Sequence, residues 1–150
     1  MRGVWIGLAA ALFAASACAP GEPSITVEQP ELRASLGDTP TAAAYLTLRN
    51  SGGAADRLVG AECDCAAMVM AHETVTTGGV ARMAHEPAVT APARGTVVFQ
   101  PGGRHLMLTG LKAPIRAGDK VTITLRFETS GAIPVVFNAV DTPSAPHAGH

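Results

Sequence analysis

Hydrophobic and polar residues alternate along most of the chain in a pattern typical of β-strands. Residues 121–127 show this most clearly, with valine, isoleucine, leucine and phenylalanine at every second position and threonine or arginine between them. A period of two places the apolar side chains on one face of a strand and the polar ones on the other. We therefore expect a half-buried strand here, preceded by a turn at Gly118-Asp119.

The same type of pattern predicts eight further strands and no helix. The glycine and proline residues that separate them, such as Gly52-Gly53, Gly78-Gly79 and the run 101–103, are typical of turns. No apolar period of 3.6 residues is long enough to predict a helix. Short strands at this spacing favour an all-β sandwich or barrel. The further expected strands are residues 25–29, 42–50, 56–62, 67–75, 80–84, 96–100, 104–110 and 132–140.

The first 17 residues have the layout of a secretion signal, with a positive charge at Arg2, an apolar stretch and small residues at the end. The apolar stretch is too short to cross a bilayer comfortably. Residues 15–18 also resemble a bacterial lipobox, which predicts lipidation of Cys18, although Ala15 stands where leucine is usual. Ordinary cleavage after Ala17 is the alternative. Either way we expect an exported protein of the periplasm or cell envelope. With lipidation, the N-terminal lipid would be its only contact with the membrane.

Length and charge limit what the exported part can be. We expect a signal peptide at residues 1–17, a lipidated N-terminus and spacer at 18–23, one domain at 24–141 and a flexible tail at 142–150. The formal net charge is −1. Such a chain lacks the basic surface that would indicate a nucleic-acid partner.

Two of the expected strands carry histidine and methionine at every second position. His105 and Met107 are two residues apart, and Met68, Met70 and His72 follow the same spacing. Side chains at i and i+2 share one face of a strand. Each of these two strands therefore presents imidazole and thioether groups on a common face.

These donor types favour monovalent copper. A thioether is a soft, neutral ligand that suits Cu(I) when combined with neutral imidazole, and Met83 on the next expected strand adds another. Thioethers also remain usable outside the cytoplasm, where free thiols tend to become disulfides. Taken singly, each methionine is ordinary core filler. The combination favours a metal site, because imidazoles in a core need polar partners.

The spacing His72-x10-Met83-x21-His105-x-Met107 resembles the copper-ligand motif of the PCuAC family, the extracytoplasmic copper chaperones of bacteria. The resemblance extends over about residues 25–140. It implies a cupredoxin-like Greek-key β-sandwich, one Cu(I) site made by these four residues and no catalytic residue. It also implies delivery of copper toward the dinuclear copper site of cytochrome c oxidase, either to the oxidase subunit itself or through another periplasmic copper chaperone.

Two features depart from the family pattern. Cys63 and Cys65 are separated by one residue, and a disulfide between them would close a small ring. The alternatives are a reduced pair, a bridge to another molecule, an auxiliary thiolate site for copper, or an incidental role. In the tail, His147 and His150 would provide imidazoles that could capture Cu(II), with simple disorder as the alternative.

Neighbouring residues need separate expectations. Met70 shares the expected face of His72 and is weighed as a shield for the metal or a substitute ligand. Met68 is expected in the core or at the rim of the site. His85 lies outside the family spacing and is expected at the surface, and Glu73 is expected on the opposite face of its strand.

Other classes of function stay open alongside the copper chaperone. One is a periplasmic copper-sequestration or resistance protein that never passes its metal on. Another is a non-metal adhesion or assembly module that uses the methionine faces as a contact patch. An enzyme is disfavoured, because the sequence shows no nucleophile paired with a base.

Overall fold

The computed structural model describes residues 21–33 and 40–142. The expectations for the signal peptide, for lipidation at Cys18 and for the tail histidines His147 and His150 lie outside these residues. In the described part of the chain no helix is long and apolar enough to cross a membrane.

Ten β-strands and no helix make up the described residues. Each strand expected from the alternating pattern overlaps one of them, and the additional strand is the three-residue β6. Their bounds are β1 Ile25–Arg33, β2 Thr41–Asn50, β3 Asp56–Glu62, β4 Ala66–Thr77, β5 Val80–His85, β6 Val89–Ala91, β7 Gly95–Phe99, β8 Arg104–Leu111, β9 Lys120–Phe127 and β10 Gly131–Val140.

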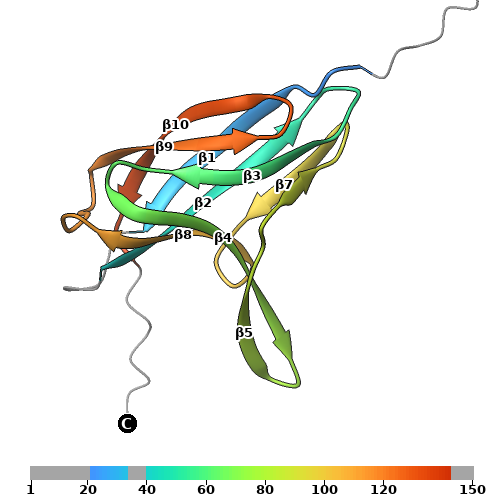
Figure 1. The fold of residues 1–150 in the computed structure, drawn as a ribbon. Coiled ribbons are helices and arrows are strands. Elements are labelled where there is room, and N and C mark those ends of the chain that lie inside the picture. Colours follow the sequence, from blue (N-terminus) through green and yellow to red (C-terminus); the bar gives the residue numbers. More distant parts are fainter. Residues whose placement is uncertain (1–20, 34–39, 143–150) are drawn as a thin grey trace, which may run out of the picture.

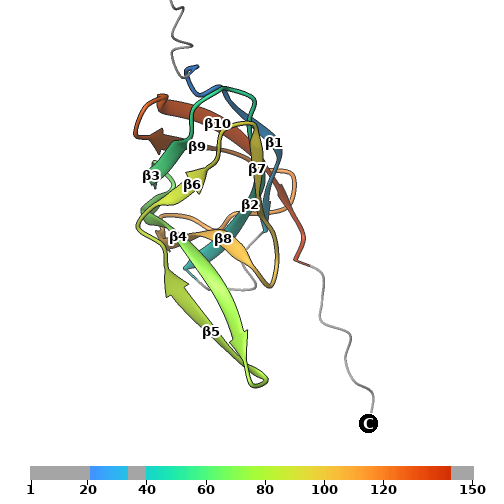
Figure 2. The ribbon, with the colours of Figure 1, turned by 90° about the vertical axis from the view of Figure 1, so that its right-hand side faces the viewer.

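The strands form one sheet that curls back on itself. Its order is β5-β4-β8-β2-β1-β10-β9-β3-β6, with β7 paired to the second half of β2. A further contact between β3 and β4, at Ala61 and Val69, closes the sheet into a barrel-like sandwich (Figures 1 and 2). β1 and β10 run parallel, and the other pairs are antiparallel. The all-β expectation is therefore confirmed.

The apolar face of each main strand fills the interior. In β9, Ile123 and Leu125 are fully buried while Thr124 between them and Arg126 after them are not, as the alternating pattern predicts. Burying large aliphatic side chains removes apolar surface from water and is the main stabilising contribution to such a fold. The largest fully buried apolar side chains are Leu32, Leu46, Leu48, Leu106, Leu108, Ile123, Leu125 and Phe137.

One hairpin extends away from this body. β4 passes along the barrel and then continues with β5 into a two-stranded arm (Figures 1 and 2). Every residue of β5 is exposed. The turn uses Gly78 and Gly79, both at positive φ, a conformation that glycine adopts without strain. The arm begins where β4 leaves β8, and the candidate site lies at that point.

Candidate metal-binding site

β4 and β8 bring the two histidine and methionine runs side by side. The two strands pair antiparallel, with Met70 opposite Met107 and His72 opposite His105, residues that are more than thirty positions apart in sequence. Directly opposed residues of an antiparallel pair project to the same face. Four soft or borderline donors thus occupy two adjacent cross-strand pairs on one face of the sheet.

His105 is the buried member of this group, at 6% exposure. Its Nδ1 lies 3.1 Å from the carbonyl oxygen of Gly103. Because a carbonyl can only accept, Nδ1 must carry the proton and donate it. The same oxygen accepts the backbone N–H of Thr74 from β4 at 3.1 Å. This arrangement fixes the ring and leaves the lone pair of Nε2 for a ligand, as is usual for metal-binding histidines.

His72 lacks such a partner. Its Nδ1 is buried and makes no hydrogen bond in the structure. Burial lowers the pKa of His72, and charge on His105 and His85 would lower it further. The imidazole is therefore held in its neutral form, which is the form that coordinates metals. A buried polar atom without a hydrogen-bond partner is uncommon in a folded protein and is consistent with a side chain that binds a ligand.

The imidazole of His72 lies between two others. Its ring centroid is 5.9 Å from that of His105 on β8 and 5.7 Å from that of His85 on β5. His85 is exposed, as expected, but the sequence did not indicate that it would be paired directly with His72. The register of the β4–β5 hairpin, counted back from Gly78-Gly79, is the signal that could have revealed it.

The methionines are spread along the same face. Met70 and Met107 are half-buried beside the histidine pair, whereas Met68 is 52% exposed and belongs to the rim rather than the core. Met83 lies on β5 opposite Thr74 and is 59% exposed. β5, which carries Met83, and β8, which carries Met107, pair with opposite edges of β4, so the two methionines lie on either side of His72. The structure therefore brings His72, His105 and Met107 together with Met70, and leaves Met83 on the arm.

An ion-pair cluster holds the base of the arm against β8. Arg104, which precedes His105, makes a two-pronged contact with Glu86 and lies 3.6 Å from Glu73. Hydrogen bonding to Glu86 raises the pKa of Arg104 further above its usual value. The backbone N–H of Glu86 also donates to the carbonyl of Ala71. Planar guanidinium–carboxylate pairs of this type fix geometry, so they position His105 relative to β4 and β5.

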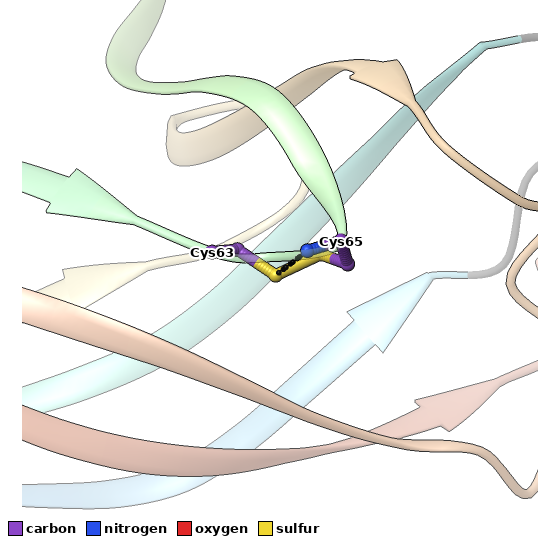
Figure 3. The surroundings of a disulfide bond; sticks show 2 residues. All are labelled: Cys63 and Cys65. Carbon is purple, nitrogen blue, oxygen red and sulfur yellow. Dashed lines mark hydrogen bonds between the residues drawn. A yellow bond between two sulfur atoms is a disulfide. The ribbon is translucent and has the colours of Figure 1, made fainter.

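Cys63 and Cys65 are joined to each other in a disulfide (Figure 3). The expected alternatives of free thiols or a bridge to another molecule are thus not what the structure shows. In this oxidised state neither sulfur is a thiolate that could bind copper. The bond lies before the first residue of β4, at the opposite end of that strand from the arm.

The donor set differs from that of a hard-metal site. Within residues 21–33 and 40–142, no group of three or more histidine, cysteine, aspartate or glutamate side chains is placed to hold a metal ion. What the site face offers instead is two imidazoles and several thioethers, all uncharged. Imidazole binds several transition metals, but thioethers are poor ligands for Zn²⁺, Mg²⁺ or Ca²⁺, so the combination suits a soft monovalent ion.

Sequence comparison identifies the family of the chain. Residues 25–139 match the family described as "Putative lipoprotein LpqE-like". The chain belongs to this LpqE-like family. A "Putative lipoprotein" of Leifsonia xyli subsp. xyli is 35% identical over 132 residues, covering 87% of this chain and 80% of the relative.

Solved structures show the same fold. The copper-bound PCuAC domain from PmoF2 superposes with a TM-score of 0.67 at 29% identity, covering 79% of this chain and 93% of the domain. The Cu(I)-bound solution structure of DR1885 from Deinococcus radiodurans gives a TM-score of 0.63 at 36% identity, with 87% and 86% covered. These matches confirm the resemblance to PCuAC domains and the expected fold class.

Proposed function

We propose that this LpqE-like protein binds one Cu(I) ion through His72, Met83, His105 and Met107 and passes it to another protein. The observation that carries the proposal is the cross-strand pairing of His72 with His105 next to Met107, with the Nδ1 of His72 buried and unpartnered. The copper-bound state of the PmoF2 domain and of DR1885 supports copper as the cargo.

Neutral donors explain why the ion would be Cu(I). Four uncharged ligands leave the charge of the metal uncancelled, and a half-buried site tolerates one positive charge far better than two. Burial lowers the pKa of His72, which favours the neutral imidazole that can coordinate a metal, and the Gly103 carbonyl accepts from Nδ1 of His105, which leaves Nε2 as the nitrogen of that ring that can face an ion.

The exposed arm suits transfer rather than storage. Met83 supplies its thioether from β5, all of whose residues are exposed, while the other three donors lie on the barrel wall. Bending of the arm would bring Met83 onto the ion and complete the site. Releasing Met83 first would open a coordination position for a donor of the receiving protein, so that the ion moves by stepwise ligand exchange.

A Cu(I) titration tests the binding step. The purified domain, competing anaerobically with a chromophoric Cu(I) chelator, is expected to bind one tight equivalent, and the His72→Ala/His105→Ala double variant is expected to lose it. His85→Ala is the matched control, because it removes a neighbouring imidazole that is outside the proposed ligand set. Its affinity should stay within about threefold of wild type, well below the tenfold step of 1.4 kcal/mol. Absence of a tight equivalent in wild type, or its retention in the double variant, would contradict the proposal.

The receiver that we propose is the dinuclear copper site of cytochrome c oxidase, reached directly or through a second periplasmic copper chaperone. Incubating the Cu(I)-loaded protein with the apo oxidase subunit should move copper to the subunit, as read by its visible absorption after oxidation. A sequestration protein would keep its copper in the same mixture. That result would leave the proposed Cu(I) binding in place, but it would show that the protein stores copper and does not deliver it.

We further propose that the protein works in the cell envelope, tethered through a lipid on Cys18. The lipoprotein description of its family and of the Leifsonia relative supports this. Mass spectrometry of the protein isolated from its native membrane is expected to show a diacylglyceryl mass on Cys18. An unmodified chain that begins at Cys18 would contradict lipidation.

A further inference from the structure

The Cys63–Cys65 disulfide contributes little to holding the fold together. It encloses a single residue, Asp64, between the end of β3 and the start of β4 (Figure 3). These strands already pair at Ala61 and Val69, and the turn is closed by a hydrogen bond from the N–H of Ala66 to the carbonyl of Cys63. Cross-links stabilise a fold mainly by closing long loops in the unfolded chain, and this loop contains only one residue between the two cysteines.

The turn distinguishes the two sulfur atoms chemically. The backbone N–H of Cys65 donates a hydrogen bond to Sγ of Cys63 at 3.1 Å (Figure 3). In thiol–disulfide exchange a thiolate attacks one sulfur while the other leaves as a thiolate, and a more stable leaving thiolate leaves faster. A donor aimed at Cys63 Sγ stabilises negative charge there. Cys65 is thus the sulfur to be attacked and Cys63 the leaving group.

The surroundings of the pair are open and acidic. Both cysteines are only half-buried, so each is in part open to solvent. A surface hollow on the Cys63 side, which Cys65 does not line, is formed by Glu62, Cys63, Asp64, Thr122 and Thr124. Glu62 is paired with Arg126, whereas Asp64 is exposed next to the bond. Carboxylates repel an anionic thiol and attract one carried on a cationic group or basic surface.

We propose that Cys63–Cys65 is an exchange-active disulfide that takes two electrons from a dithiol on a neutral or basic surface. The first thiolate of the dithiol bonds to Cys65 Sγ, the disulfide bond breaks, and Cys63 leaves as a thiolate and takes up a proton. The second thiol then attacks the mixed disulfide and releases Cys65. The protein becomes a dithiol and the partner a disulfide, with two electrons and two protons transferred.

This activity is separate from copper binding. Cys65 and His72 are seven residues apart on or beside one extended strand, which corresponds to roughly 23 Å at about 3.3 Å per residue. The two sites can therefore be tested independently. Failure of one would leave the other standing.

The decisive experiment maps the mixed disulfide. The folded protein is treated at low salt with cysteamine or with mercaptoethanesulfonate at equal thiolate concentration, quenched in acid and digested for mass spectrometry. We expect the adduct on Cys65 in both cases, formed at least about fivefold faster with the cationic thiol. Adduct formation mainly on Cys63, or no preference between the thiols, would overturn the proposal.

Variants and a folding readout complete the test. Asp64→Asn should speed the reaction with mercaptoethanesulfonate, whereas Glu28→Gln, which removes an exposed carboxylate on β1, should not. Excess dithiothreitol should reduce the pair while the far-ultraviolet circular dichroism stays that of the folded protein. Resistance to dithiothreitol, or unfolding on reduction, would show a structural bond instead.

Discussion

Polar side chains are buried in two regions of the molecule: a corner formed by Asn50 and Asp56, and the face that carries His72 and His105. The two regions differ in how many of these buried polar atoms have a hydrogen-bond partner. Asn50 and Asp56 are 1% and 2% exposed. The Asn50 amide oxygen accepts from the N–H groups of Ser24 and Gly52, and its nitrogen donates to the carbonyls of Ala54 and Ala91. The full hydrogen-bonding capacity of that side chain is used.

Asp56 is equally well satisfied. Its carboxylate accepts the backbone N–H groups of Arg57, Thr129 and Ser130, which joins the start of β3 to the turn after β9. His72, in contrast, keeps a buried nitrogen without a partner, and the lone pair of His105 Nε2 is left over by its bond to Gly103. The comparison shows that buried polar groups with a structural role have all their hydrogen-bond partners in this fold, whereas the proposed metal donors have a nitrogen left without one.

Removing the satisfied carboxylate should have the largest effect on the fold. Asp56→Ala leaves three part-buried N–H donors without their acceptor, where a fully buried donor would cost about 1–3 kcal/mol. We expect the free energy of unfolding to fall by about 3–4 kcal/mol, measured by urea denaturation. Cu(I) affinity of the folded fraction should be unchanged, because the corner lies outside the site. A loss of less than about 1 kcal/mol would show that water replaces the carboxylate there.

The opposite result is expected on the metal face. His72→Leu removes the orphaned nitrogen and keeps a side chain of similar bulk, so the free energy of unfolding of the metal-free protein should stay within about 0.5 kcal/mol or rise. Cu(I) affinity should fall by about 100-fold, or 2.7 kcal/mol. Cu(I) should accordingly raise the melting temperature of wild type and not of this variant. Marked destabilisation without copper would mean that His72 is a structural residue.

Acid should weaken the satisfied corner specifically. Burial by itself raises the pKa of Asp56, but hydrogen bonds from Ser130, Thr129 and Arg57 outweigh it and hold the pKa below its usual value. A carboxylate with a lowered folded-state pKa contributes its full stabilisation above the unfolded pKa of about 4, and loses it as the pH falls through the folded-state value. Urea unfolding from pH 7 to 3 should therefore show a steeper loss of stability in wild type than in Asp56→Asn. Equal pH dependence in the two proteins would contradict this assignment.

The sequence predicted where the strands lie better than it predicted which strands pair with each other. Alternation located the main strands, because period-two patterns survive wherever one face is buried, but β6 was missed because it is three residues long and lies between Pro87 and Pro92. The pairing of β4 with β8 is non-local, and no turn signal encodes its register. The sequence could therefore place Met70 and Met107 on one type of face without showing that they are directly opposed.

The same limit applies to the candidate donors. The family spacing named His72, Met83, His105 and Met107, and their common membership in a metal site stays a prediction. The ligand spacing alone did not show that His85 is the β5 residue opposite His72, with Met83 farther out on an exposed arm, although the hairpin register counted from Gly78-Gly79 could have shown it. Nor could it show that Gly103 would fix the His105 ring, since that contact depends on how β8 begins.

The smallest effect should distinguish two methionines on the same strand face. Met70 is half-buried and directly opposite Met107, whereas Met68 is opposite Thr109 and largely exposed. If Met70 shields the ion or substitutes as a ligand, Met70→Leu should lower Cu(I) affinity by about tenfold, or 1.4 kcal/mol, because leucine keeps the bulk and removes the sulfur. Met68→Leu is the matched control and should bind as wild type does in the chelator competition. Equal Cu(I) affinities for both variants would show that Met70 only packs against the site, and that the metal donors of this face are the four residues of the proposed site.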